Sequence, residues 1–129
     1  GLVPDRDVSG LETNDASIVA KYIFGTTCFL LTGDSPVKIE DYLVKYYGSG
    51  MKCDVLKAGH HGSKTSTGEN YLNAVQPEIA IISAGKDNSY GHPHVEVIER
   101  LQKAGVKILN TAEDGTIRLV SDGEKITAR

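Results

Sequence analysis

The order of hydrophobic and polar residues along the chain alternates between short apolar runs and apolar residues at helical spacing. Residues 17–24 and 27–31 are two runs rich in β-branched and aromatic side chains. Gly25-Thr26 between them predicts a hairpin of two strands, both largely buried. Three later runs have the length and composition of strands, and they lie at 53–56, 79–83 and 106–109.

Between these runs the apolar residues recur every three or four positions, which is typical of helices that bury one face. The predicted helices lie at 36–47, 69–75 and 94–104. Pro36 suits the first turn of a helix, and Gly48 and Gly105 follow two of the helices where glycine commonly ends them. The alternation of strands and helices predicts an α/β fold, with helices packed on a mixed sheet.

The two ends of the chain differ in character. Residues 1–13 are polar and without a sustained period, which predicts an arm or linker, so the domain is expected to span residues 14–129. Near the other end, 116–120 and 125–127 flank Asp122-Gly123, which predicts a final hairpin.

Composition narrows the class of protein. The 129 residues are 40% hydrophobic and 24% charged, enough for one buried core. A formal charge of -3 without a long basic run gives no general electrostatic attraction for nucleic acid. Cys28 and Cys53 lie in apolar runs and are expected to be buried free thiols, so the compartment stays open. No stretch has the roughly 20 apolar residues of a membrane span, which predicts a soluble domain.

Candidate metal ligands follow three of the predicted strands. Asp34 follows the hairpin, His60-His61 follow the strand at 53–56, and the loop 85–94 holds the other two histidines. Because ligands bind outside the carboxyl ends of strands in α/β sheets, these groups are expected to meet at one sheet edge. A carboxylate and neutral imidazoles are ligands of hydrolytic metal centres.

Each of these residues also has a structural interpretation. Asp34 could cap the helix that follows it. His60 and His61 could be surface side chains in a glycine turn, and His94 is interpreted as the start of a helix. The segment 63–67 is a hydroxyl-rich loop that could also hold an anionic oxygen.

Several motifs together resemble the metallo-β-lactamase-fold domain of ComEC-type competence proteins. They are Asn14-Asp15-Ala16-Ser17, Leu30-Leu31-Thr32-Gly33-Asp34, Asp54-Val55-Leu56-Lys57, Gly59-His60-His61-Gly62-Ser63, Ile81-Ile82-Ser83 and Asn88-Ser89-Tyr90-Gly91-His92-Pro93-His94. The resemblance implies an αββα sandwich that holds two divalent metal ions, zinc or manganese, and hydrolyses a phosphodiester. DNA taken up in competence is the leading substrate, which makes the protein a nuclease.

The resemblance also implies roles for single residues. Asp34 would bridge the two ions and His61 would bind one of them, although the order of His60 and His61 stays open. His60 and His92 would face the substrate as catalytic groups. A phosphoryl oxygen would be oriented by Ser63, Asn88 and Tyr90.

The chain lacks the family's His-x-His-x-Asp-His motif, because its one His-x-His is His92-Pro93-His94. The resemblance therefore covers the C-terminal half of the domain only. Three explanations stay open: a piece of a longer enzyme, a natural half that pairs with another chain, or a degenerate module. The longer protein could be a membrane-associated or secreted bacterial one, although this chain itself would not contact the membrane.

A half-sandwich would leave one sheet face apolar and exposed, so the chain is expected to pair with the missing N-terminal half or with itself. With two or three ligands it is expected to bind metal weakly or not at all, and to be inactive alone. Other ester hydrolases with the same metal chemistry, such as a lactonase or a phosphorylcholine esterase, are the alternative enzyme. A non-catalytic interaction module is the alternative outside the enzymes.

Overall fold

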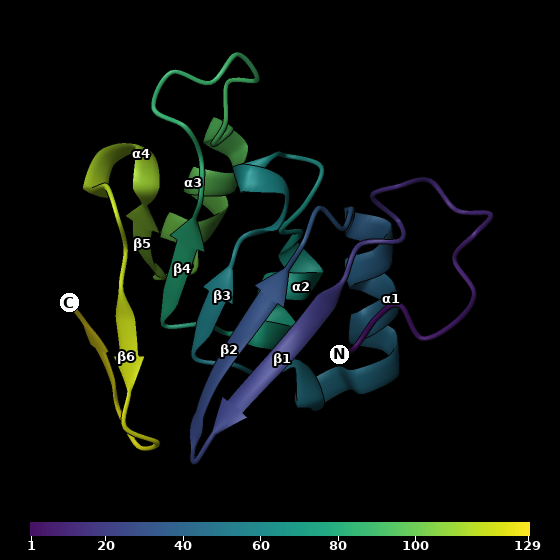
Figure 1. Cartoon of the computed structure of the whole chain (residues 1–129), viewed down its shortest axis with the longest axis horizontal. Coiled ribbons are helices and arrows are strands. Elements are labelled where there is room, and N and C mark those ends of the chain that lie inside the picture. The colour runs from purple at the N-terminus through teal and green to yellow at the C-terminus, as the bar shows by residue number, and fades with distance from the viewer.

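The computed structural model describes residues 1–129 and is built around one five-stranded sheet (Figure 1). In spatial order its strands are β1 (Val19–Phe24), β2 (Thr27–Thr32), β3 (Val55–Lys57), β4 (Ile79–Ile82) and β5 (Lys107–Asn110). β1 pairs with β2 in antiparallel orientation, and the other neighbours are parallel. The predicted α/β fold with a mixed sheet is confirmed.

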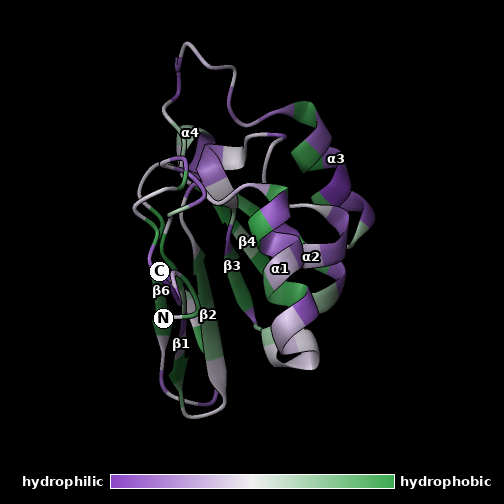
Figure 2. Cartoon of the chain, turned by 90° about the vertical axis from the view of Figure 1, so that its right-hand side faces the viewer, coloured by the Kyte–Doolittle hydropathy of each residue, from purple (hydrophilic) through white to green (hydrophobic).

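Helices cover one face of this sheet (Figure 2). They are α1 (Val37–Tyr47), α2 (Glu69–Val75) and α3 (Val95–Lys103). A short helix, α4 (Thr111–Asp114), follows β5, and two 3₁₀ turns, η1 (Gly48–Met51) and η2 (Gly59–Gly62), precede and follow β3. The core lies between sheet and helices and includes the fully buried residues Leu30, Leu43, Leu56, Ala80, Ile82, Val97 and Leu101.

The predicted burial of the first hairpin is wrong for β1. Side chains alternate between the two faces of a strand, so Val19 is buried beneath the helices, whereas Tyr22 and Phe24 point to the opposite face and are 61% and 49% exposed. On β2, Leu31 shares that open face and is 48% exposed. β1 is the edge strand of the sheet, and the choice of edge strand depends on pairing that local sequence does not encode.

The final hairpin, β6 (Leu119–Ser121) and β7 (Ile126–Ala128), forms a separate two-stranded sheet, as predicted. In Figure 2 it lies on the side of the sheet away from the helices. Its turn is joined to the β1–β2 turn, where the Thr26 amide donates to the Gly123 carbonyl at 2.7 Å. The hairpin therefore covers part of the open face near this end of the sheet.

The first residues of the chain are attached to this sheet rather than separate from it. Val3 forms an antiparallel bridge with Val19 and is 7% exposed. The predicted domain boundary at residue 13 is not tested by these contacts and stays a prediction. None of the helices combines the length with the apolar character that crossing a membrane would require.

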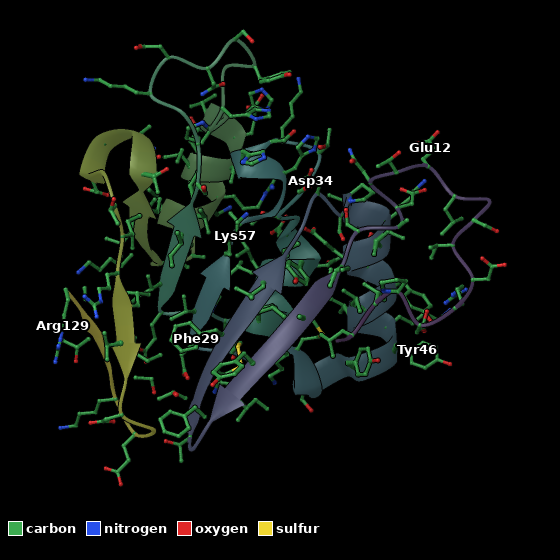
Figure 3. The ribbon with its side chains drawn as sticks, in the orientation of Figure 1. Glu12, Phe29, Asp34, Tyr46, Lys57 and Arg129 are labelled. Carbon is green, nitrogen blue, oxygen red and sulfur yellow. A yellow bond between two sulfur atoms is a disulfide. The ribbon has the colours of Figure 1, made fainter.

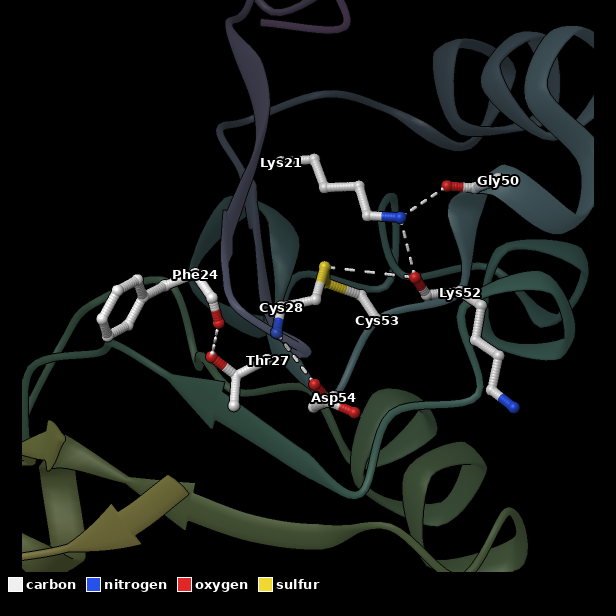
Figure 4. The surroundings of a disulfide bond; sticks show 8 residues. All are labelled: Lys21, Phe24, Thr27, Cys28, Gly50, Lys52, Cys53 and Asp54. Carbon is white, nitrogen blue, oxygen red and sulfur yellow. Dashed lines mark hydrogen bonds between the residues drawn. A yellow bond between two sulfur atoms is a disulfide. The ribbon is translucent and has the colours of Figure 1, made fainter. Parts of the chain in front are cut away.

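The expectation that the cysteines are free thiols is wrong, because Cys28 and Cys53 form a disulfide with their Cα atoms 5.0 Å apart (Figure 4). Cys28 lies on the buried face of β2, and Cys53 lies just before β3, the parallel neighbour of β2. The Cys28 amide also donates to the Asp54 carboxylate at 2.8 Å. The two apolar runs look independent in the sequence, and their pairing appears only once the strands are placed side by side.

Removing the disulfide with the double substitution Cys28→Ser and Cys53→Ser is expected to lower the free energy of unfolding by about 3 kcal/mol. The bond closes a loop with a sequence separation of 25 residues and so restricts the unfolded chain. Urea denaturation of the oxidised protein, the reduced protein and the variant measures this loss. Equal stability of the oxidised and reduced forms would contradict a structural disulfide.

Candidate functional site

The predicted site residues follow the carboxyl ends of three adjacent strands. Asp34 follows β2, the η2 turn with His60 and His61 follows β3, and the loop with His92 follows β4. Because these strands are parallel neighbours, their ends meet at one edge of the sheet (Figure 1). The structure therefore brings the predicted metal ligands and both predicted catalytic histidines together.

Asp34 and His61 form the centre of this group. The Oδ1 atom of Asp34 lies 4.0 Å from the Nε2 atom of His61, and both side chains are about half exposed. The Nδ1 atom of His61 is 2.7 Å from the Ser83 carbonyl oxygen. Since a carbonyl only accepts hydrogen bonds, Nδ1 carries a proton, and in the neutral ring Nε2 is then the nitrogen whose lone pair can bind a metal ion.

This geometry fits a metal ion between the two side chains. Histidine ligands commonly donate their second nitrogen to a backbone carbonyl, as His61 does to Ser83. Two ligands bound tetrahedrally to one zinc ion lie roughly 3.3 Å apart, so the pair would need to close by less than about 1 Å. The chain holds no cluster of three or more His, Cys, Asp or Glu side chains placed for a metal, so it would supply only part of a coordination shell.

The capping interpretation of Asp34 is not supported by the structure. Pro36 is the N-cap residue of α1, and no side chain caps that helix. The only hydrogen bond found for Asp34 joins its backbone amide to the Ser17 hydroxyl at 3.2 Å. Its carboxylate is therefore available for a ligand.

The turn that holds the two histidines has an unusual backbone. His60 and His61 have φ values of 46° and 55°, in the left-handed region that residues with a Cβ atom rarely adopt. The turn is fixed at both ends, because the His60 amide donates to the Gly33 carbonyl at 3.0 Å and the Ser63 amide to the His60 carbonyl at 2.9 Å. The strained turn thus attaches the histidine pair directly to the segment that carries Asp34.

Both glycines that flank the pair are required by close packing. A Cβ atom on Gly59 would lie 2.8 Å from the Cβ of Ser66, and one on Gly62 would lie 2.7 Å from the Cβ of Pro93. The two glycines of the Gly-His-His-Gly motif therefore allow the chain at Ser66 and at Pro93 to pack closely against this turn.

His92 completes a group of three imidazole rings at the sheet edge. Its ring centroid lies 5.6 Å from that of His60 and 6.4 Å from that of His61. Burial lowers the pKa of His92, and the neighbouring rings of His94, His60 and His61 lower it further. The surroundings of His92 therefore favour its neutral ring over the charged one.

His94 precedes the first residue of α3, which confirms its interpretation as a helix start. Its Nδ1 atom accepts a hydrogen bond from the Lys64 amide at 2.9 Å, and its backbone amide donates to the Gly62 carbonyl at 2.9 Å. His94 thereby attaches α3 to the histidine turn without joining the metal ligands.

The three predicted substrate-binding residues lie at the same edge in different surroundings. Ser63 is buried, and its hydroxyl lies 2.9 Å from that of Thr65. Asn88 uses its side-chain amide within its own loop, where it donates to the Gly85 and His92 carbonyls and accepts from the His92 amide. Tyr90 is 76% exposed. Their contact with a substrate stays a prediction.

Lys57, the last residue of β3, is one site neighbour that the sequence did not single out. It is half-buried on the open face near Asp34 (Figure 3). Burial lowers the pKa of Lys57, and the Asp34 carboxylate partly opposes this shift. The alternation of side chains along β3, with the buried Leu56 facing the helices, is the signal that could have placed Lys57 there.

Glu40 is a second missed residue, and it lies fully buried on α1. Its two carboxylate oxygens accept hydrogen bonds from the backbone amides of Thr67 at 2.6 Å and Gly68 at 2.8 Å. The Thr67 hydroxyl in turn accepts from the Gly59 amide at 3.1 Å. Glu40 therefore supports the loop that lies behind the histidine turn. Its burial could have been inferred from the sequence, because it lies three residues before Leu43 in the apolar stripe of α1.

The chain is similar to segments of several bacterial proteins, and no family model matches it. It is 44% identical over 105 residues to ComE operon protein 3 of Bacillus subtilis, which covers 81% of this chain and 13% of that protein. It is 40% identical over 108 residues to Competence protein ComA of Neisseria gonorrhoeae, with 84% of this chain and 16% of the relative covered. It is 43% identical over 118 residues to Recombination protein 2 of Haemophilus influenzae, with 92% and 15% covered. The chain thus spans about a sixth or less of the length of these relatives.

Proposed function

This chain belongs to the family of the competence proteins, as a homologue of one segment of them. From this premise we propose that it supplies part of a metal centre that hydrolyses DNA phosphodiesters during DNA uptake. The observation that carries the proposal is the Asp34–His61 pair at the sheet edge. His61 is held in the tautomer of a metal ligand by Ser83, and the Asp34 carboxylate is free of structural hydrogen bonds.

The ligands would be Asp34, through a carboxylate able to bridge two ions, and His61, through Nε2. Divalent zinc or manganese bound there would lower the pKa of a water molecule toward neutrality and offset negative charge on the phosphoryl group. His60 and His92 would face the substrate from the same edge. As a neutral ring, His92 can donate one N–H hydrogen bond to a phosphoryl oxygen or accept a proton from a water molecule.

Two protein ligands do not complete such a centre, which typically uses three or four for each ion. We propose that the remaining ligands come from a second sheet that covers the open face, as in a metallo-β-lactamase αββα sandwich. That face carries exposed Tyr22, Phe24 and Leu31, of which Leu31 lies nearest to the end of β2 that Asp34 follows. The second sheet could belong to the preceding coding sequence or to another copy of this chain. Alone, the chain would bind zinc weakly.

The proposal is tested by phosphodiester cleavage measured with and without metal. The 129-residue chain, joined to whatever coding sequence precedes it in its gene, is incubated with a DNA oligonucleotide and Mn²⁺ or Zn²⁺. Cleavage is expected to stop with excess EDTA and to return when metal exceeds the chelator, because Asp34 and His61 act through the ion. The chain alone serves as the comparison and is expected to be inactive.

Undiminished cleavage in EDTA, or a well-folded protein inactive with every ion tested, would contradict the proposal. A carboxylic-ester hydrolase would use the same ligands, since specificity resides in the surrounding loops. Parallel assays with p-nitrophenyl acetate and bis(p-nitrophenyl) phosphate distinguish these two reactions.

A further inference from the structure

A cavity of about 300 Å³ lies beside the Asp34–His61 pair, between the end of β4 and the loop that follows it. It is lined by His61, Ser83, Ala84, Gly85, Asn88, Tyr90 and His92. We propose that this cavity binds one unpaired nucleobase of a single-stranded nucleic acid by stacking. This inference rests on the proposed function. It proposes that the cavity holds the base next to the phosphodiester that would be cleaved.

The aromatic rings of the cavity lie nearly parallel to one another. The planes of Tyr90 and His92 differ by 24°, with their centroids 5.6 Å apart. The planes of His92 and His61 differ by 17°, with their centroids 6.4 Å apart. Rings that lie nearly parallel can stack with a flat aromatic guest inserted in the same orientation, and bases stacked on aromatic side chains contribute about 1 to 3 kcal/mol each.

Several backbone groups of the wall are already engaged within the protein. The Ser83 carbonyl accepts from His61, and the amide and carbonyl of Ala84 both bond to the Thr111 hydroxyl. The Gly85 carbonyl accepts from Asn88. The hydroxyls of Ser83 and Tyr90 and the ring nitrogens of His92 make no hydrogen bond within the protein, so a base in this cavity would find ring faces together with groups that can bond to its edge.

The position of the cavity selects unpaired bases. Its lining includes His61, whose Nε2 atom faces Asp34, so a nucleotide with its phosphate at that pair would carry its base toward Tyr90 and His92. In a duplex each base is already stacked on both faces and paired at its edge. Placing such a base in the cavity would require a few kcal/mol of unstacking, which a single strand avoids.

The test compares the binding of two metal-free probes to the 129-residue chain by fluorescence anisotropy. One probe is a labelled oligothymidylate of eight nucleotides, and the other is the same phosphodiester backbone with abasic residues. The oligothymidylate is expected to bind about tenfold more tightly. Tyr90→Ala is expected to remove this preference, and Tyr90→Phe is expected to retain it.

Tyr46→Ala is the matched control, because Tyr46 is an exposed tyrosine on α1, 70% exposed against 76% for Tyr90. It is expected to leave the preference unchanged. Equal binding of the two probes to the unmodified chain, no measurable binding of either, or an undiminished preference in Tyr90→Ala would each overturn the inference. Because no metal or cleavage enters this measurement, its outcome is separate from that of the hydrolysis assay.

Discussion

Glu40→Ala is expected to lower the free energy of unfolding by about 3 to 5 kcal/mol, measured by urea denaturation. The substitution removes the acceptors of the Thr67 and Gly68 amides, which are buried and would be left without partners. It also removes the carboxylate whose charge is opposed to that of Arg100 on α3. The loop behind the histidine turn would lose its attachment to α1.

A change of pH tests the same contact by a different route. Burial raises the pKa of Glu40 to about 7, and the neighbouring Asp41 contributes to this rise. The Gly68 and Thr67 amides and Arg100 lower the pKa but do not cancel the effect of burial. Because the folded state holds the proton more tightly than the unfolded state, this group's contribution to stability is greatest below about pH 4.5 and falls as the pH rises through 7. The loss is about 3 kcal/mol.

Glu40→Gln carries no titrating group at this position and is expected to remove that part of the pH dependence. Glu99→Gln, on the exposed surface of α3, is the matched control and is expected to keep it. The same slope of stability against pH in the unmodified chain and in Glu40→Gln would show that Glu40 does not titrate as proposed. Full stability of Glu40→Ala would show that the loop has another support.

Elements set by local spacing could be predicted from the sequence. The predicted helix at 69–75 coincides with α2, the one at 36–47 begins one residue before α1, and the one at 94–104 is one residue longer than α3 at each end. The short helix α4 was not predicted, because one turn has too few positions to show a period. Its signal was Asn110, whose side chain accepts from the Ala112 amide as an N-cap.

Features that depend on strand order could not be predicted. The exposure of Tyr22 follows from β1 being an edge strand with an open face, and the Cys28–Cys53 bond follows from the parallel pairing of β2 and β3. Both require knowing which strands are neighbours, and the helix α1 lies between the two cysteines in the sequence. Burial and cysteine pairing were therefore the properties that the sequence interpretation missed.

The candidate site also combines features that could be predicted from the sequence with features that could not. Convergence of Asp34 with the histidine pair was predictable, because the ends of parallel strands meet at one edge. The left-handed turn at His60 and His61 was not, since neighbouring side chains on an extended segment would point in opposite directions. The proton on Nδ1 of His61 also depends on Ser83, a residue of another strand end.

Asp34→Asn is expected to lower kcat for DNA cleavage by about 10³-fold or more in the protein used for the cleavage assay. An asparagine amide is neutral and cannot bridge two ions, so the stabilisation of the anionic transition state is lost with the metal centre. Steady-state cleavage in saturating Mn²⁺ measures the change. Stability is expected to change by less than about 0.5 kcal/mol, because the Asp34 carboxylate is half exposed and caps no helix.

Asp87→Asn is the matched control for Asp34→Asn, because Asp87 is an exposed carboxylate on the loop that carries His92. It is expected to leave kcat within about twofold, since a charge change on an exposed surface loop acts only through screened electrostatics. An Asp34→Asn protein that keeps its kcat while KM rises would show that Asp34 contacts substrate without binding metal. An unchanged kcat and KM would remove Asp34 from the site, and the proposed centre would lose the carboxylate on which it depends.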